Sequence, residues 1–319
     1  MCFGLGVEKK NSGFTIIEVI MVLALFLVII PPFITILKLS ADKIVFYMDY
    51  RKAFDRTSRV VALLKAPVFY CGFGMPVSAE RYKNVFCNLN FAPFDWNGPI
   101  ESITGPSAYP NSELRIVYAQ PARWKLDEPS NGVAFTGCVL LTETPEVSEL
   151  PTSFSRNSTD LKRWLLFRGI VPPSLPLYIT CAKGKNLIVE NNISSHFSIP
   201  NGERPYVFRA MKVYCMNDRV YTRDFRASGE QPRVTGIQDM RFDVDMENKL
   251  ITMYVLSRGD IVYACGQKII GQESWPEEYI KPWKEKGSRY QMYAYKFVWR
   301  LPNCICENII SSESIEELF

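Results

Sequence analysis

An apolar run near the N-terminus constrains this chain more than any other feature. From Phe14 to Leu37 the sequence reads FTIIEVIMVLALFLVIIPPFITIL, with Glu18 as its single charged side chain. As an α-helix at about 1.5 Å per residue the run is ~36 Å long, enough to cross a hydrocarbon core of about 30 Å with some tilt. The sequence therefore predicts a transmembrane helix over residues 14–37.

The flanks of this run predict its orientation. Lys9 and Lys10 precede it, and the positive-inside rule holds such a short basic flank in the cytoplasm. An ordinary secretory signal would end in small residues, but Pro31-Pro32 and Lys38 stand there and no A-x-A pattern follows. We therefore expect the bulk of the chain to lie outside the cytoplasm and to keep its helix.

The junction before the run carries a processing signal. KKNSG is followed by FTIIEV, so Gly13 and Phe14 stand just ahead of Glu18. This combination resembles the class III signal of type IV prepilins and of the pseudopilins of type II secretion. The resemblance implies that a prepilin peptidase removes residues 1–13 as a cytoplasmic leader by cutting after Gly13. Phe14 then becomes the methylated N-terminus.

Glu18 has two interpretations. A carboxylate in a membrane helix is costly unless it reaches water or a partner. It can reach the headgroups at the nearby cytoplasmic interface. The resemblance implies instead that it pairs with the α-amine of Phe14 on a neighbouring subunit, which fixes the axial register of packed helices. The FTIIEV context favours the second interpretation, and Phe14 and Glu18 are then assembly residues.

The helical pattern continues beyond the apolar run to about Lys65. Residues 38–65 contain no proline or glycine, and charged side chains crowd one side of the segment. The predicted apolar face consists of Ile44, Tyr47, Met48, Arg51, Phe54, Ser58, Val61 and Leu64. One long helix from Phe14 to about Lys65 follows, with a kink or a locally melted turn at Pro31 and Pro32.

After Pro67 the pattern changes to short extended runs separated by turn residues, which predicts a β-rich head over residues 66–319. The predicted strands are 113–119, 133–142, 163–168, 177–181, 186–190, 206–215, 219–225, 237–246, 250–257, 261–264 and 292–301. Residues 66–110 are rich in turn formers and are expected to be irregular. The expected fold class is α+β, a long N-terminal transmembrane helix packed on a large antiparallel β-rich head.

Several head segments are similar to the large minor pilins and to the J-type pseudopilins. They are FDRTSRVVALLKAPVFYCGFG, NSELRIVYA, VYCMNDRVYTRDF, PRVTGIQDMRFDVDM, ITMYVLSRGD and YKFVWRLPN. The resemblance implies a subunit that primes or caps a type IV pilus or a type II secretion pseudopilus. Its partners would be other pilin or pseudopilin subunits and the inner-membrane assembly platform. The alternative is a single-pass, membrane-anchored extracytoplasmic binding or adhesion protein that does not polymerise. Residues 120–205 show no such likeness.

Nine cysteines are present, and removal of residues 1–13 takes away Cys2. The remaining disulfide candidates are Cys71, Cys87, Cys138, Cys181, Cys215, Cys265, Cys304 and Cys306. All would lie in an oxidising compartment, which allows up to four disulfides. Cys71 with Cys87 is the first expected pair because both flank a turn-rich segment. Cys304 and Cys306 point to opposite faces of an extended stretch, so each is expected to pair with a distant cysteine. A thiolate metal site is the competing interpretation, and no C-x-x-C supports it.

The composition argues against an enzyme or a nucleic-acid-binding protein. His196 is the single histidine, no G-x-S-x-G motif occurs, and acid pairs such as Asp243 with Asp245 suit solvated strand faces. The net charge of +4 is small and spread along the chain, without a basic run. We expect no catalytic site, no cofactor and no metal. The aromatic and charged segment 275–291 is either a partner-binding loop or a surface loop with its rings packed inward.

Overall fold

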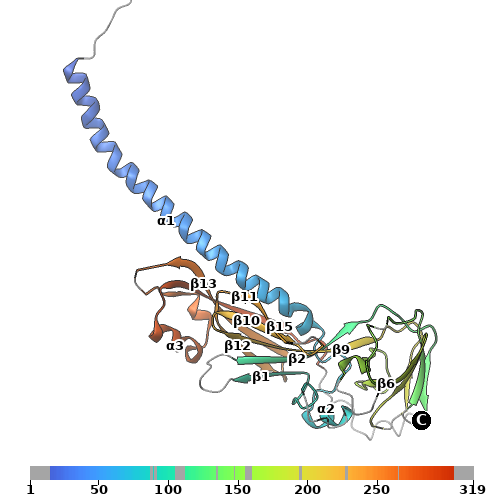
Figure 1. Cartoon of the computed structure of the whole chain (residues 1–319). Coiled ribbons are helices and arrows are strands. Elements are labelled where there is room, and N and C mark those ends of the chain that lie inside the picture. The colour runs from blue at the N-terminus through green and yellow to red at the C-terminus, as the bar shows by residue number, and fades with distance from the viewer. Residues whose placement is uncertain are drawn as a thin grey trace, which may run out of the picture. The chain divides into compact units, whose positions relative to one another are not determined.

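The computed structural model describes residues 15–86, 89, 92–104, 112–133, 136–146, 148–154, 160–193, 196–226, 229–264 and 266–304. The chain divides into two compact units, Met1–Arg51 and Lys52–Phe319. One long apolar helix starts in the first unit and ends in the second, which holds a large antiparallel β-sheet domain (Figure 1). The expected α+β class is confirmed.

Helix α1 (Ile16–Phe69) is one helix of 54 residues. It begins at Ile16 and runs without a break through the two segments that were expected to be helical, 14–37 and 38–65. It ends beyond Lys65, at Phe69. Its N-terminal part is long and apolar enough to cross a membrane, and the most apolar window is wholly exposed.

The predicted melted turn at Pro31 and Pro32 is wrong, because every residue of α1 is helical. A proline removes one hydrogen bond to the residue four positions earlier, so this pair deprives two carbonyl groups of their usual donors. The carbonyl groups concerned are those of Leu27 and Val28, four positions before Pro31 and Pro32. Ending the helix here would leave more backbone groups unsatisfied, which is expensive in apolar surroundings.

The buried face of α1 in the second unit also differs from the predicted one. Its members are Ala53, Thr57, Val60, Leu64 and Val68. Leu64 alone belongs to the predicted face, whereas Phe54 is 45% exposed. The physical reason lies at Ser257, whose hydroxyl donates to the Ala53 carbonyl at 3.2 Å and accepts from the Thr57 hydroxyl at 3.2 Å. Small residues let the helix approach the sheet closely, and a pattern built on large apolar residues misses such a face.

Two sheets make up the second unit. In the described residues the larger sheet has 11 strands: β1 (Ile100–Thr104), β2 (Ser112–Pro121), β3 (Ser130–Val133), β4 (Thr136–Leu140), β5 (Trp164–Leu166), β6 (Leu177–Lys183), β7 (Asn186–Glu190), β8 (Phe197–Ile199), β9 (Tyr206–Met216), β10 (Arg219–Asp224) and β11 (Glu230–Thr235). The smaller sheet consists of β12 (Ile237–Asp245), β13 (Leu250–Val262), β14 (Ile269–Ile270) and β15 (Tyr290–Arg300). Neighbouring strands are antiparallel except β14, which runs parallel to β15.

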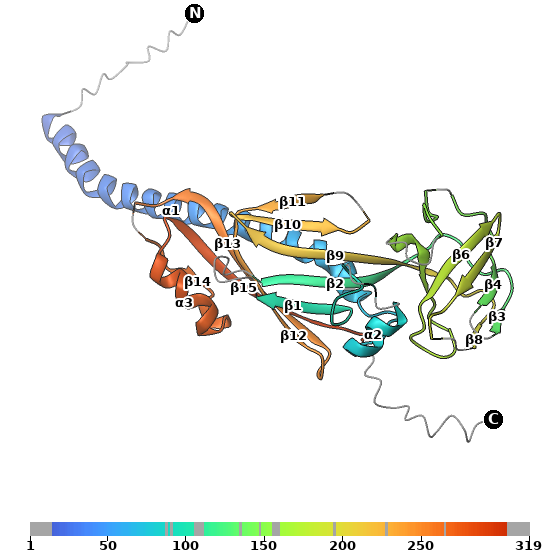
Figure 2. The ribbon, with the colours of Figure 1, turned by 60° about the horizontal axis from the view of Figure 1, so that its bottom comes forward.

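Strand β9 organises the larger sheet. It pairs with β2 along most of its length, with β10 through its C-terminal half and with β5 through Tyr206 and Val207. The order continues from β5 through β6, β7, β4 and β3 to β8. Figure 2 shows this second group of strands gathered at the N-terminal end of β9. A single long strand thereby links two strand groups that have separate cores.

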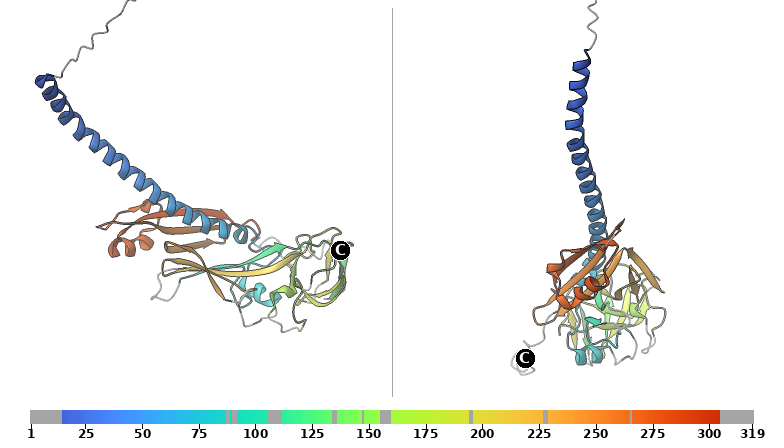
Figure 3. Two further views of the ribbon diagram at one scale, coloured as in Figure 1. Left: turned by 45° about the horizontal axis from the view of Figure 1, so that its top comes forward. Right: turned by 90° about the vertical axis from the view of Figure 1, so that its left-hand side faces the viewer.

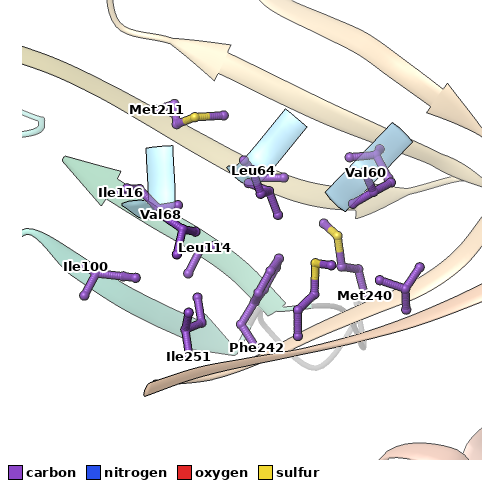
Figure 4. Packing of buried hydrophobic residues seen from close by; sticks show 14 of the residues in the cluster. Val60, Leu64, Val68, Ile100, Leu114, Ile116, Met211, Met240, Phe242 and Ile251 are labelled. Atoms are coloured by element: carbon purple, nitrogen blue, oxygen red, sulfur yellow. The ribbon is translucent and has the colours of Figure 1, made fainter. Parts of the chain in front are cut away.

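The main core forms where α1 meets both sheets. Figure 4 shows Val60, Leu64 and Val68 of the helix among apolar side chains of the strands. Those labelled there are Ile100, Leu114, Ile116, Met211, Met240, Phe242 and Ile251. Figure 3 shows the last turns of α1 lying along the smaller sheet. Further clusters lie under α2 (Ala79–Val85), inside the strand group 124–199, and beneath α3 (Glu277–Lys286).

Several strand predictions need correction. The predicted strand 133–142 corresponds to β4 alone, and β3, which ends at Val133, was missed. The two predicted strands 250–257 and 261–264 are the one strand β13. The ring of Phe197 explains the close pairing of β3 with β4, since a Cβ on Gly132 would lie 2.0 Å from it. In the sequence alone, glycine is typical of turns, so a strand glycine that leaves space for an aromatic ring does not predict a strand.

The segment Trp275–Gln291 contains helix α3 and the start of β15, so the prediction of a loop was wrong. The rings do pack inward: Trp275 is buried, and its Nε1 donates to the Tyr295 carbonyl at 3.0 Å. Ile280 anchors the helix as a fully buried residue. This part of the chain therefore packs on the head, as the second of the two alternatives expected.

Candidate functional site

The start of α1 is a capping box formed by Thr15 and Glu18. The Thr15 hydroxyl accepts from the backbone N–H of Glu18 at 3.3 Å. The Glu18 carboxylate accepts from the Thr15 backbone N–H at 2.9 Å and from its hydroxyl at 3.1 Å. Each residue thus satisfies a donor that the helix start would leave open.

Both bonds from Thr15 end on Oε2 of Glu18. The other oxygen, Oε1, accepts no hydrogen bond from a residue that the structure describes. The local role and an external role of this carboxylate are therefore compatible, because one oxygen caps the helix while the other is open to a cation. Gly13 and Phe14, the other two predicted residues of this site, lie outside the described residues.

Downstream of the cap, α1 presents a continuous apolar surface. Every residue from Ile16 to Met48 is exposed, and the run to Leu37 contains no charge other than Glu18. A monomeric water-soluble protein rarely exposes apolar surface on this scale, so a membrane or other apolar helices must cover it. Within the described residues, α1 is the one helix long and apolar enough to cross a membrane.

Two cysteines meet where α1 ends. Cys71 follows the helix, and Cys304 follows β15; the Cys304 thiol lies 3.7 Å from the Cys71 carbonyl. Both are buried, free thiols. Burial raises the pKa of Cys71 well above its usual value, and the Cys304 thiol raises it further. Gly72 makes room for this contact, since a Cβ there would lie 2.6 Å from the Cys304 sulfur.

Three more of the disulfide candidates, Cys138, Cys181 and Cys215, lie in the described residues. Cys138 and Cys181 are free, and both lie opposite Ile188, on the two sides of β7. Two strand spacings separate them by about 10 Å, too far for a disulfide. The Cys215 thiol donates to the Ile237 carbonyl at 3.1 Å. Cys87, Cys265 and Cys306 lie outside the described residues, so the predicted pair of Cys71 with Cys87 stays a prediction.

The titratable groups of the head serve mainly structural contacts. Asp239, a buried carboxylate, accepts hydrogen bonds from Arg241 at 3.2 Å and from Trp283 Nε1 at 2.8 Å. Asp243 accepts from the Tyr279 hydroxyl at 2.6 Å, and is thus not simply a solvated strand residue. His196 is exposed beside β8. Among the described residues, no three His, Cys, Asp or Glu side chains gather as a metal site would require.

Sequence reasoning missed two features that the structure brings together. The capping box has a sequence signature, since Thr15 and Glu18 stand at the T-x-x-E spacing just before an apolar run. The contact between Cys71 and Cys304 has none, because 233 positions separate the two residues.

Comparisons with protein-family models, with curated proteins and with solved structures found no match to this chain. A functional assignment therefore rests on the residues and geometry described above.

Proposed function

We propose that this protein is a minor pilin or pseudopilin, a membrane-inserted precursor that is cut after Gly13 and joins a type IV pilus or a secretion pseudopilus. One observation carries the proposal. An uninterrupted helix bears the FTIIEV signal at its start, a fully exposed apolar surface along its first half, and a β-rich head on its last turns.

The open oxygen of Glu18 supports the assembly role. After the cut, the α-amine of Phe14 would lie next to the capping box, and the same group on a neighbouring subunit would meet Oε1 when helices pack side by side. An ammonium–carboxylate contact in apolar surroundings is strong only if both groups are placed well, so it selects one axial offset between helices. The capping box holds the carboxylate in place for such a contact.

The size of the head supports a terminal position in the filament. Lys52–Phe319 is a large compact unit carried by the last turns of one helix. A subunit with so much bulk can have few neighbours stacked beyond it, so it would prime or cap the filament rather than form its shaft. In this account the N-terminus faces the cytoplasm and the head lies outside the inner membrane.

The test separates the charge of Glu18 from its capping role. Glu18→Gln keeps a capping box, because glutamine suits that position as well as glutamate, but it removes the charge. Thr15→Ala removes the cap hydroxyl and keeps the charge. We expect Glu18→Gln to insert in the membrane and be cut normally, yet to be depleted at least about tenfold from sheared filaments, since breaking a buried ion pair costs about 3–5 kcal/mol.

Thr15→Ala is the matched control and should still enter filaments, because a lost cap costs only about 1 kcal/mol in a helix of this length. Recovery is measured as the ratio of each variant in the sheared fraction to its level in membranes. Equal recovery of Glu18→Gln and wild type would contradict the pairing role. Absence of the wild-type chain from filaments would contradict the proposed function and favour a membrane-anchored binding protein that does not polymerise.

A further inference from the structure

A cavity of about 350 Å³ opens in the head where β2 leaves the main core. Its wall includes Arg209 of β9, Arg226 after β10, Lys162 of the short 3₁₀ turn before β5, and Arg123 with Trp124 after β2. Segments far apart in the sequence thus place four cationic side chains around one space.

The acidic groups near this space are already engaged. Glu149, which also lines it, accepts from Trp124 Nε1 at 3.0 Å and from the backbone N–H of Glu146 at 3.2 Å. Asp224 accepts from the backbone N–H of Arg226 at 2.8 Å and reaches Arg209 Nη1 only at 3.5 Å. Glu146 lies 3.6 Å from Arg123, and Asp160 and Asp224 both act on Arg226. Among the side chains that line the cavity itself, however, four are cationic and only Glu149 is acidic.

Two guanidinium N–H groups at the site lack acceptors. The Nε atoms of Arg209 and Arg226 are buried and have no hydrogen-bond partner among the described residues. A buried donor without an acceptor is destabilising, and more so when it is charged. Arg226 also lies near the like charge of Arg209, and burial together with that charge lowers the pKa of Arg226 to about 10. It is still protonated near neutral pH.

An anion bound in the cavity would offset the repulsion between Arg209 and Arg226. An oxyanion accepts from two guanidinium groups and neutralises their repulsion, and arginine is suited to carboxylate, sulfate and phosphate because of its planar fork of donors. The cavity is near the lower end of the usual range for ligand sites, about 300–1,000 Å³, so it suits a ligand no larger than one sugar unit.

We propose that this cavity binds the oxyanion group of a small ligand, a carboxylate, sulfate or phosphate, through Arg209 and Arg226, with Lys162 as an additional positive charge. This gives the head a recognition role beyond its place in a filament. The same chemistry can come from a free inorganic anion or from an acidic sugar such as a uronic acid.

The test is a titration of the full-length protein in detergent with sodium sulfate, phosphate, acetate and glucuronate at matched ionic strength. Wild type should bind at least one of them saturably. Arg226→Gln should weaken that binding by about tenfold or more, as expected for loss of a charge-assisted contact. Arg223→Gln is the matched control: this arginine is exposed on β10, outside the cavity, and its loss changes the net charge equally.

Preference for glucuronate over the inorganic anions would assign the site to an acidic sugar, and the reverse preference would assign it to a free oxyanion. Without added ligand, Arg226→Gln should unfold at the same temperature as wild type or higher, because it removes a poorly compensated buried charge. Absence of saturable binding of every anion would overturn the proposal. So would equal weakening by Arg223→Gln, or a lower unfolding temperature of Arg226→Gln, which would mark a structural arginine.

Discussion

Cys71 and Cys304 join the end of the long helix to the end of the last strand. Asn303 reinforces this junction, because its side-chain amide donates to the Phe69 carbonyl at 2.6 Å. With both thiols buried and the pKa of Cys71 raised, the reactive thiolate is scarce in the folded state. Oxidation would therefore have to occur while the chain is folding.

We expect Cys71 to form a disulfide with Cys304, in place of the pair with Cys87 predicted from the sequence, when the protein matures in an oxidising compartment. A protein disulfide oxidant accepts two electrons and two protons from the thiols, is reduced to its dithiol, and leaves one S–S bond. Peptide mapping without reductant should find the linked peptides. Reduction should lower the free energy of unfolding by about 2–5 kcal/mol, whereas Cys138→Ser and Cys181→Ser should leave it nearly unchanged. Recovery of Cys71 and Cys304 as free thiols from that compartment would contradict this prediction.

Single functional residues could be predicted from the sequence, but the residues that contact them in the folded protein could not. Glu18 was predicted as a functional carboxylate from its place in an apolar run, and the structure adds its cap partner, Thr15. The contact of Cys71 with Cys304 and the cavity around Arg226 could not be predicted. Each depends on strands that meet only in the folded head, and no local pattern reports such pairing.

Among the elements, α1 differs most from its prediction, because its buried face begins with two small residues, Ala53 and Thr57, before Val60, Leu64 and Val68. Ala53 contacts Ser257 through its backbone carbonyl, and Thr57 shares that hydroxyl. Periodicity gave the extent of the helix well, since the absence of proline and glycine between 38 and 65 left one continuous pattern. The same periodicity predicted the wrong buried face, because it selects large apolar side chains such as Phe54. In the structure Phe54 is exposed.

Enlarging this small face should push the helix off the sheet. Ala53→Leu adds three carbon atoms where a hydrogen bond now joins helix and strand, and we expect a loss of about 1–3 kcal/mol in the free energy of unfolding. Ala62→Leu makes the same change on an exposed part of the same helix and should alter stability by less than about 0.5 kcal/mol. Thermal unfolding of the full-length protein in detergent measures both. Equal stability of Ala53→Leu and Ala62→Leu would show that the close contact is unimportant.

Strands were predicted best where their residues alternate between buried and exposed positions. β7 was predicted with its observed bounds, and β2 and β9 to within two residues at either end. Short or polar strands were missed: β8 has three residues, and β11 carries Pro232 and Arg233 at an edge of the sheet. Their pairing depends on the neighbouring strand rather than on their own composition.

The whole molecule consists of a helix of membrane-spanning length and a head that holds two sheets and several separate cores. The N-terminal part of α1 is long and apolar enough to span a membrane, and the continuity of α1 from Ile16 to Phe69 gives the head a direct covalent link to that part. Under the proposed function the chain is cut ahead of α1 and enters a filament, whereas under the alternative it stays in the membrane and does not polymerise.

The N-terminus of the mature protein tests this central claim most directly. Mass spectrometry of the protein extracted from membranes should find a chain of residues 14–319 that begins with an N-methylated Phe14. Gly13→Val should leave the precursor uncut while its membrane level is unchanged, because the cut requires a small residue but insertion does not. A dominant wild-type species that retains Met1 to Gly13 would contradict the account.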